Sequence, residues 1–137
     1  MSVKPYEEVP HTADWALRVR GATLADLFAH AAEGMYALMG GEPEPGAGAQ
    51  ERNVDLTADD AESLLIAWLN ELLFFTEADG VVFDDFRIRL SGETRLEARA
   101  TGRPTANLKK QIKAATYHNL HIAKTASGRE ATIVFDV

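Results

Sequence analysis

The stretch that decides the fold is Leu64–Leu73 (LLIAWLNELL), the most hydrophobic run in the chain. Together with Phe75, its apolar residues recur at helical spacing and form a wide apolar face. The sequence therefore predicts a central core helix, with Thr57 or Asp59 as its N-cap. Trp68 is expected to belong to the core rather than to a ligand platform, because large aromatic side chains are mostly buried.

A second amphipathic helix is predicted upstream of this run. Thr23 is a suitable N-cap, and apolar residues recur every three or four positions over the next four turns. Gly40 and Gly41 are expected to end the helix. Residues 41–50 are rich in glycine and proline, so they are predicted to form a connecting loop rather than a site.

Alternating apolar and charged residues predict the strands of the fold. These strands fall at residues 15–21, 52–56, 81–90 and 95–103, with a C-terminal hairpin of residues 117–124 and 130–137. Two long helices with five to seven strands in hairpins indicate an α+β fold, with the helices on one face of a mostly antiparallel or mixed sheet. The length of 137 residues predicts one domain, residues 1–137.

Composition limits the function classes. The chain has no cysteine, which excludes a disulfide framework, a thiolate zinc site and a cysteine nucleophile. It has no apolar run of the ~20 residues that span a bilayer and no signal-peptide core, so we expect a cytoplasmic protein without a membrane partner. A net charge of −7 disfavours direct binding of RNA and favours a basic protein partner.

The last two residues form an acidic group of their own. Asp136 precedes Val137, so its side chain adjoins the α-carboxylate of Val137. If the fold brings Asp14 beside them, three carboxylates share one place and need a counter-cation such as Ca²⁺ or Mg²⁺. The alternative is that Asp136 is a solvated residue at a strand end and Asp14 a turn or cap residue. Glu71, near the apolar side of the central helix, is a secondary candidate for this acidic group.

The residues from 109 to 118 are basic within an acidic chain. This segment contains Lys109, Lys110, Lys113, Tyr117 and His118. One interpretation is a solvated turn that leads into a strand. The other is a surface patch that contacts phosphate or an acidic partner. The sequence has no glycine-rich nucleotide motif and no Gly-x-Ser-x-Gly elbow, which disfavours an enzyme with its own nucleotide cradle or serine nucleophile.

Taken together, these segments resemble the archease family over nearly the whole chain. The resemblance rests on four motifs in the family's order: His11-Thr12-Ala13-Asp14, Leu64–Leu73, Lys113-Ala114-Ala115-Thr116-Tyr117-His118 and Val134-Phe135-Asp136-Val137. Two departures are Ala115, where a larger apolar residue is usual, and the glycine- and proline-rich loop.

The resemblance implies a role that the residues alone do not reveal. Archeases assist the RtcB-type RNA ligase in tRNA splicing by promoting guanylylation of the ligase and its multiple turnover, and they are not themselves the ligase. Carried over by motif, the family's metal site falls on Asp14, Asp136 and Val137, with Ca²⁺ expected and Mg²⁺ or Mn²⁺ as other choices. RNA would then be contacted only indirectly. Candidate partner contacts are His11, Lys109, Lys110, Lys113, Tyr117 and His118.

Two other function classes remain open at this point. One is a chaperone-like interaction module that modulates other RNA-processing proteins, with a purely structural metal. The other is an independent metal-dependent hydrolase. We disfavour the hydrolase because no histidine or serine constellation accompanies the carboxylates.

Overall fold

The structure is a computed structural model that describes residues 4–9, 15–105 and 107–137. These residues form two long helices, α1 (Leu24–Met39) and α2 (Ala61–Asp79). The strands are β1 (Tyr6–Val9), β2 (Trp15–Gly21), β3 (Gln50–Thr57), β4 (Val81–Ser91), β5 (Arg95–Pro104), β6 (Ala114–Thr116), β7 (Ala123–Thr125) and β8 (Gly128–Asp136).

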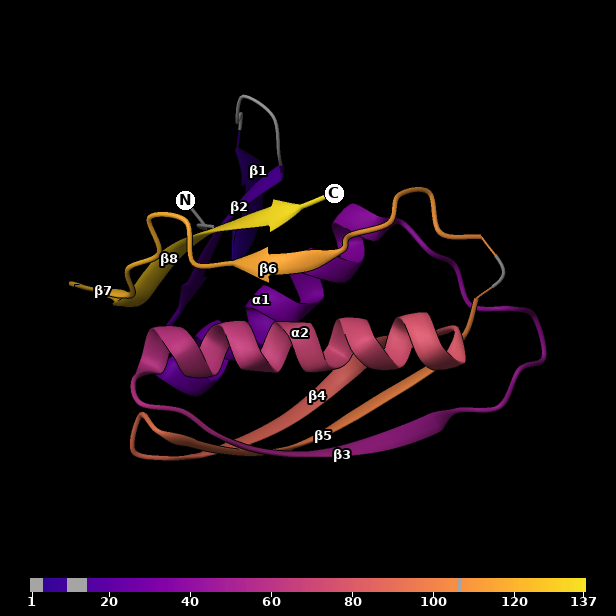
Figure 1. The fold of residues 1–137 in the computed structure, drawn as a ribbon, viewed down its shortest axis with the longest axis horizontal. Helices are drawn as coiled ribbons and strands as arrows, with labels where there is room; N and C mark the ends of the chain where they lie inside the picture. Colours follow the sequence, from indigo (N-terminus) through magenta and orange to yellow (C-terminus); the bar gives the residue numbers. More distant parts are fainter. Residues whose placement is uncertain (1–3, 10–14, 106) are drawn as a thin grey trace.

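The strands form two antiparallel sheets. The larger sheet has the order β1-β2-β8-β6, with β7 also paired to β8, and the smaller sheet has the order β3-β5-β4. Both helices lie between the two sheets and contact each of them, as α2 does between β6 and β3–β5 in Figure 1. The predicted α+β class with two long helices is confirmed. The division into two sheets gives each sheet one face toward the helices and one toward solvent.

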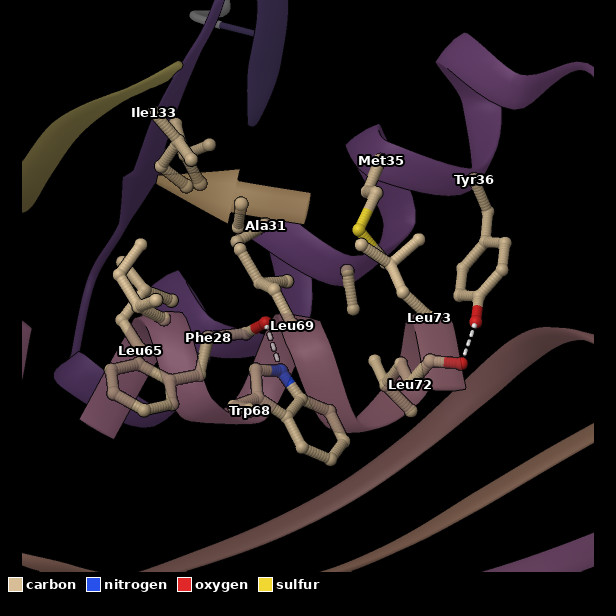
Figure 2. Close-up of a cluster of buried hydrophobic side chains, with 14 of the residues drawn as sticks. Phe28, Ala31, Met35, Tyr36, Leu65, Trp68, Leu69, Leu72, Leu73 and Ile133 are labelled. Carbon is tan, nitrogen blue, oxygen red and sulfur yellow. Dashed lines mark hydrogen bonds between the residues drawn. The ribbon is translucent and has the colours of Figure 1, made fainter. Parts of the chain in front are cut away.

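Helix α2 is the centre of the core, as predicted. The Trp68 side chain is fully buried, and its Nε1 donates a hydrogen bond of 3.0 Å to the Phe28 carbonyl oxygen on α1 (Figure 2). Its ring meets Phe86 of β4 edge-on, with centroids 5.9 Å apart. In the described chain neither helix is long and apolar enough to cross a membrane.

A buried hydroxyl also joins the two helices. The Tyr36 hydroxyl of α1 lies 2.7 Å from the Thr76 hydroxyl and donates to the Leu72 carbonyl oxygen, 3.2 Å away, both on α2 (Figure 2 draws the second contact). Burial raises the pKa of Tyr36 because the phenolate would lose its hydration. The hydroxyl therefore stays neutral and makes a fixed polar link inside an apolar core.

The ends of the helices follow capping rules, with one correction. For α1, Thr23 accepts from the Asp26 amide at 3.1 Å and Gly40 takes the left-handed conformation, as predicted. For α2, the predicted N-cap of Thr57 or Asp59 is wrong. The N-cap is Asp60, whose Oδ1 accepts from the Ser63 amide at 2.7 Å.

The correction at α2 has a clear physical reason. The backbone of Thr57 still pairs with β5 as the last residue of β3, so it cannot begin a helix. Asp60 has extended backbone angles and a carboxylate within reach of the third residue of the helix. The hydrogen bond from the Ser63 amide lowers the pKa of the Asp60 carboxyl.

The predicted C-terminal hairpin is correct at its tip and wrong further out. Strands β7 and β8 do form a hairpin, but residues 117–122 contain a turn at 118–119 and no strand. Asn119 has a positive φ of 50°, and the Leu120 amide donates to the Tyr117 carbonyl at 2.9 Å. Left-handed backbone interrupts a strand, and asparagine tolerates it better than most residues.

Candidate functional site

The C-terminal end of β8 presents the candidate acidic group. Asp136 is the last residue of β8 and is exposed, and Val137 is 40% exposed. The main chain is fixed, because the Lys113 amide donates to the Asp136 carbonyl oxygen at 2.8 Å and Ala114 pairs opposite Asp136. Within the described residues the Asp136 carboxylate makes no hydrogen bond or ion pair. Its oxygens are therefore accessible while its backbone is held.

The other end of the proposed group is only partly described. Strand β2 runs antiparallel to β8, and Trp15 is opposite Phe135. In sequence, Asp14 precedes Trp15 and Asp136 follows Phe135. Asp14 and His11 themselves lie outside the described residues, so the predicted convergence of Asp14 with Asp136 stays a prediction.

Glu71, the secondary acidic candidate, lies among the described residues, whereas Asp14 does not. Glu71 lies half-buried on α2. Among the residues that the structure describes, no group of three His, Cys, Asp or Glu side chains could hold a metal ion. Two of the three expected ligand residues, Asp136 and Val137, are described, and both are exposed at one strand end, where the Asp136 carboxylate supplies oxygen donors. Such donors fit a hard divalent cation such as Ca²⁺.

The basic segment at 109–113 links the end of α1 to the end of β8. The amides of Lys109 and Lys110 both donate to the Met39 carbonyl oxygen, at 3.0 and 3.2 Å. The Lys110 ammonium lies 3.9 Å from the centroid of the Trp15 ring, a cation–π contact. Helix α1 has no basic residue in its last turn, and the two lysine amides satisfy a carbonyl at its partly negative C-terminus.

The segment is therefore an anchored backbone with exposed side chains. Lys109, Lys110 and Lys113 are all exposed, although the backbone at each of them is hydrogen-bonded to α1 or β8. The sequence left open whether these lysines form a solvated turn or a contact patch. Both interpretations require exposed lysines, so both remain. The anchoring shows that the positions of the lysines are set by the fold.

Asn70 is a positioning residue that the sequence reasoning missed. Its Oδ1 accepts from the Ala115 amide at 2.8 Å, and its Nδ2 donates to the Ala115 carbonyl oxygen at 3.2 Å. The side chain thus binds the outer edge of β6 as a neighbouring strand would. The two contacts join the central helix to the Lys113–His118 stretch. The available signal was an amide side chain inside the mostly apolar Leu64–Leu73 run, whose only other polar residue is Glu71.

Glu62 holds the turn after β6 in a similar way. Its Oε2 accepts from the Ile122 amide at 3.0 Å and lies 3.8 Å from the His121 Nδ1. The turn that results presents Tyr117, whose side chain is 58% exposed, and an exposed His118. Helix α2 therefore binds the backbone on both sides of these two candidate contacts, at Ala115 before them and at Ile122 after them.

Of the candidate residues, Lys109 lines a hollow of about 350 Å³ beside Gly40 and Glu42, whereas two bigger hollows lie elsewhere. A hollow of about 610 Å³ lies between β1 and α1, and one of about 530 Å³ lies on the outer face of the β3-β5-β4 sheet. Neither is lined by Asp136, Val137 or the lysines at 109–113. An exposed acidic end beside an anchored basic segment suits contact with a macromolecule better than enclosure of a small substrate.

The family model and the similar proteins found by comparison all belong to one family. The model of the Archease protein family matches residues 6–137. The protein archease of Methanosarcina mazei is 39% identical, with 98% of this chain and 97% of that protein covered. That of Thermococcus gammatolerans is 34% identical, with 93% of this chain and 94% of that protein covered.

Solved structures show the same fold. The solution structure of protein 1598 from Methanobacterium thermoautotrophicum matches with a TM-score of 0.74 and 27% identity, covering 98% of this chain and 100% of that one. A crystal structure from Thermotoga maritima, described as an archease and possible chaperone, matches with a TM-score of 0.70 and 22% identity, covering 100% of this chain and 98% of that one. With the family model spanning all but the first five residues, the chain belongs to the archease family.

Proposed function

We propose that this chain is an accessory protein of an RtcB-type RNA ligase in tRNA splicing. It would promote guanylylation of the ligase and allow the ligase many turnovers, without catalysing a step itself. The observation that carries the proposal is the match to the archease family over residues 6–137, which includes the central helix, the Lys113–His118 stretch and the final Asp136-Val137. The protein partner would be the ligase, and RNA would be involved only through it.

The surface geometry supports a protein partner. Asp136 and Val137 are exposed, and the lysines at 109–113 lie nearby on an anchored backbone, since the Lys113 amide donates to the Asp136 carbonyl oxygen. Charges of both signs on an anchored backbone favour one orientation of a docked partner. Tyr117 adds an exposed aromatic ring, a side chain that is enriched at interfaces.

We also propose that Asp14, Asp136 and Val137 hold a divalent cation, with Ca²⁺ preferred and Mg²⁺ or Mn²⁺ as alternatives. The support is the exposed oxygen donor at Asp136 and the pairing of Trp15 with Phe135, the sequence neighbours of the two aspartates. Bound there, the cation would supply positive charge that offsets the carboxylates. The residues of this chain would supply the acidic donors, and Lys113 would hold the Asp136 backbone in place.

The direct test is ligase turnover. An RtcB-type ligase is incubated with GTP, divalent metal and RNA ends, with and without a small molar fraction of this protein, and guanylylated ligase is measured directly. We expect stimulation by the wild-type protein, loss of stimulation in Asp136→Asn, and no loss in the control Asp84→Asn, another exposed aspartate, on β4. Unchanged guanylylation at saturating wild-type protein would end the proposal.

Metal binding has a test of its own. Calorimetric titration with Ca²⁺ should give a site in the wild-type protein that is weakened in Asp136→Asn, while circular dichroism shows an unchanged fold. A chain that ends at Val137 is compared with one extended by a few residues, because extension turns the Val137 carboxylate into an amide. Equal Ca²⁺ affinity of both forms would remove Val137 from the proposed ligands.

The basic segment is tested separately. The triple variant Lys109→Ala, Lys110→Ala, Lys113→Ala should stimulate the ligase less and with weaker salt dependence, because fewer charges take part in docking. A matched control removes three exposed arginines from the other sheet, Arg87, Arg99 and Arg103, with the same change in net charge. Equal effects of the two triple variants would show that only net charge matters.

A second candidate function is a chaperone-like module for other RNA-processing proteins, with a structural metal. The words "possible chaperone" describe the Thermotoga maritima relative, whose likeness at 22% identity shows the fold alone. Suppression of aggregation in a thermally stressed RNA-processing protein, together with unchanged ligase guanylylation, would favour this second function.

A further inference from the structure

The edges of the two sheets differ in how they are protected. In the larger sheet the edge strands are short: β1 has four residues, β7 has three, and β6 has three with its outer edge bound by Asn70. In the smaller sheet β4 is interrupted by an irregularity between Phe83 and Asp85 and packs against α1. Short strands, irregularities and covering side chains are the usual means of blocking a sheet edge.

Strand β3 is neither short nor interrupted, and a side chain covers one of its backbone groups, the Glu51 carbonyl oxygen, which accepts from Arg52 Nη1 at 2.9 Å. The strand pairs with β5 without a break over all eight residues, Gln50–Thr57, and contains neither proline nor glycine. In the described chain no backbone hydrogen bond joins this strand to any segment other than β5. It is the outermost strand at the lower edge of the molecule in Figure 1.

The side chains of β3 define what could lie beside it. Glu51, Asn53 and Asp55 are exposed on the solvent face of the sheet, and Val54 is buried on the other face. Arg52, the strand's single cation, is half-buried and pairs with Asp79 of α2 at 3.0 Å. On the solvent face β3 itself therefore presents two carboxylates four residues apart, and the neighbouring β5 presents the exposed Arg95 and Arg99.

A second copy of the chain fits this edge poorly. Antiparallel self-pairing about Asn53 would set Glu51 opposite Asp55 twice, and pairing about Asp55 would set that carboxylate against its own copy. Pairing about Val54 would set Glu51 opposite the neutral Thr57, so none of these registers gives Glu51 a cation. Like charges directly opposite each other destabilise a strand pair. Arg95 on β5 pairs with Asp55 at 3.2 Å, whereas Glu51 has no ion pair in the described chain. The unmatched charge calls for a cation from outside.

We propose that β3 is a docking edge for an extended basic segment of another protein, which adds to the β3-β5-β4 sheet as a fourth strand. Backbone hydrogen bonds to β3 would supply most of the affinity, as in other cases of strand addition. Basic side chains spaced four residues apart would meet Glu51 and Asp55. The residues between them would alternate, with apolar side chains facing the same side as Val54. This inference does not depend on the ligase proposal.

The test uses a peptide of matching pattern. An acetylated and amidated nine-residue peptide, Lys-Val-Thr-Val-Lys-Val-Thr-Val-Lys, is titrated into ¹⁵N-labelled protein and followed by NMR. We expect shifts and slower hydrogen exchange for amides of Gln50–Thr57, with the remaining strands little changed. No change in these amides at peptide concentrations of about a few millimolar, which corresponds to roughly 4 kcal/mol of binding, would overturn the proposal.

Charge-reversal variants distinguish an effect of the carboxylates on β3 from an effect of the protein's net charge. Glu51→Lys with Asp55→Lys should weaken peptide binding by about tenfold or more, since two attractive contacts become repulsive. The control Asp84→Lys with Asp85→Lys makes the same charge change on the opposite edge strand and should leave the affinity within about twofold. Glu51→Lys alone serves if loss of the Asp55–Arg95 pair affects folding. Equal weakening at both edges would overturn the assignment to β3.

Modified peptides separate strand addition from simple attraction. A peptide of the same sequence with N-methyl groups on alternate residues keeps its charge but loses ladder donors, so it should bind much more weakly. A peptide with glutamate in place of lysine should not bind. Equal binding of the N-methylated peptide would show that charge alone acts. Sedimentation that reveals a dimer formed through β3 without peptide would show that a second copy is the occupant.

Discussion

Helix α2 is held differently on its two sides. Toward β4 and α1 it presents Trp68, which is fully buried and packs edge-on against Phe86. Toward β6 and the following turn it presents polar side chains, with Asn70 bonded to both backbone groups of Ala115 and Glu62 bonded to the Ile122 amide. One helix therefore combines an apolar interface with a polar one.

The difference separates stability from positioning. Apolar contacts are non-directional and their energy grows with buried area, so the Trp68 side should govern the global stability of the fold. Hydrogen bonds are directional and contribute less net free energy, so the Asn70 side should govern where the Lys113–His118 stretch lies. Substitutions on the two sides should thus have effects of different size and different kind.

The largest effect is expected on the apolar side. Trp68→Ala should lower the free energy of unfolding by about 3–5 kcal/mol, because it leaves a cavity and removes the bond to the Phe28 carbonyl oxygen. Urea denaturation followed by circular dichroism measures this loss. Phe74→Ala is the control, since that aromatic residue of α2 is 62% exposed and its removal should cost little. Similar losses for both variants would contradict an apolar interface centred on Trp68.

An intermediate effect is expected at Asn70, whose side chain binds the backbone of β6. Asn70→Ala should cost about 1–3 kcal/mol, because the amide and carbonyl of Ala115 both lose their partner. Hydrogen exchange should speed up at Ala115 and its neighbours while the Trp68 region keeps its protection. Asn70→Asp, which retains the acceptor and loses the donor, should fall between wild type and Asn70→Ala. Uniformly faster exchange across α2 and the core would show that the two sides are not separable.

A smaller effect is expected at Glu62. Glu62→Gln keeps an acceptor for the Ile122 amide but loses its charge, so the loss of stability should stay below about 1 kcal/mol. Hydrogen exchange at Ile122 is the sensitive measurement. Glu77→Gln, an exposed glutamate on the same helix, is the control. If Glu77→Gln speeds hydrogen exchange at Ile122 as much as Glu62→Gln does, Glu62 does not hold this turn.

The smallest effect should depend on pH. The Ser63 amide lowers the pKa of Asp60, so the ionised cap stabilises the folded state above the unfolded pKa of about 3.9. That contribution is lost as the pH falls through the still lower folded-state value. Asp60→Ala should therefore melt below wild type at neutral pH, and the difference should shrink on acidification below about pH 4. A difference that stays constant with pH, or is matched by Asp59→Ala, would contradict this role.

Local sequence patterns were sufficient for most of the fold. The helices, the strand at residues 15–21 and the loop after Gly40 follow from periodicity and capping, which depend on neighbours in sequence. The division of the strands between two sheets could not be predicted, because it depends on pairings between distant segments such as β2 with β8. The missed cap at Asp60 and the missed turn at Asn119 show that single backbone angles decide the exact boundaries.

For the candidate site, the sequence named residues but not the contacts that hold them. Asp136, Val137 and the lysines at 109–113 are exposed, which fits both interpretations that the sequence offered for each group, so their roles stay predictions. The contacts that hold them could not be predicted, because the bond from Lys113 to Asp136 and the clamp from Asn70 to Ala115 join residues far apart in sequence. Asn70, a half-buried amide in a mostly apolar run, was a local sign that a polar partner was needed.

The placement of the chain's two tryptophans has a spectroscopic consequence. Trp68 is sealed in the core, and Trp15 is half-buried beneath the Lys110 ammonium at the edge of the candidate site. Each region thus carries its own intrinsic fluorophore. An event that displaces Lys110 would alter the emission of Trp15 alone, and Trp68 would serve as an internal reference. Contact at the basic segment and loosening of the core can therefore be told apart by light emission from the unlabelled protein.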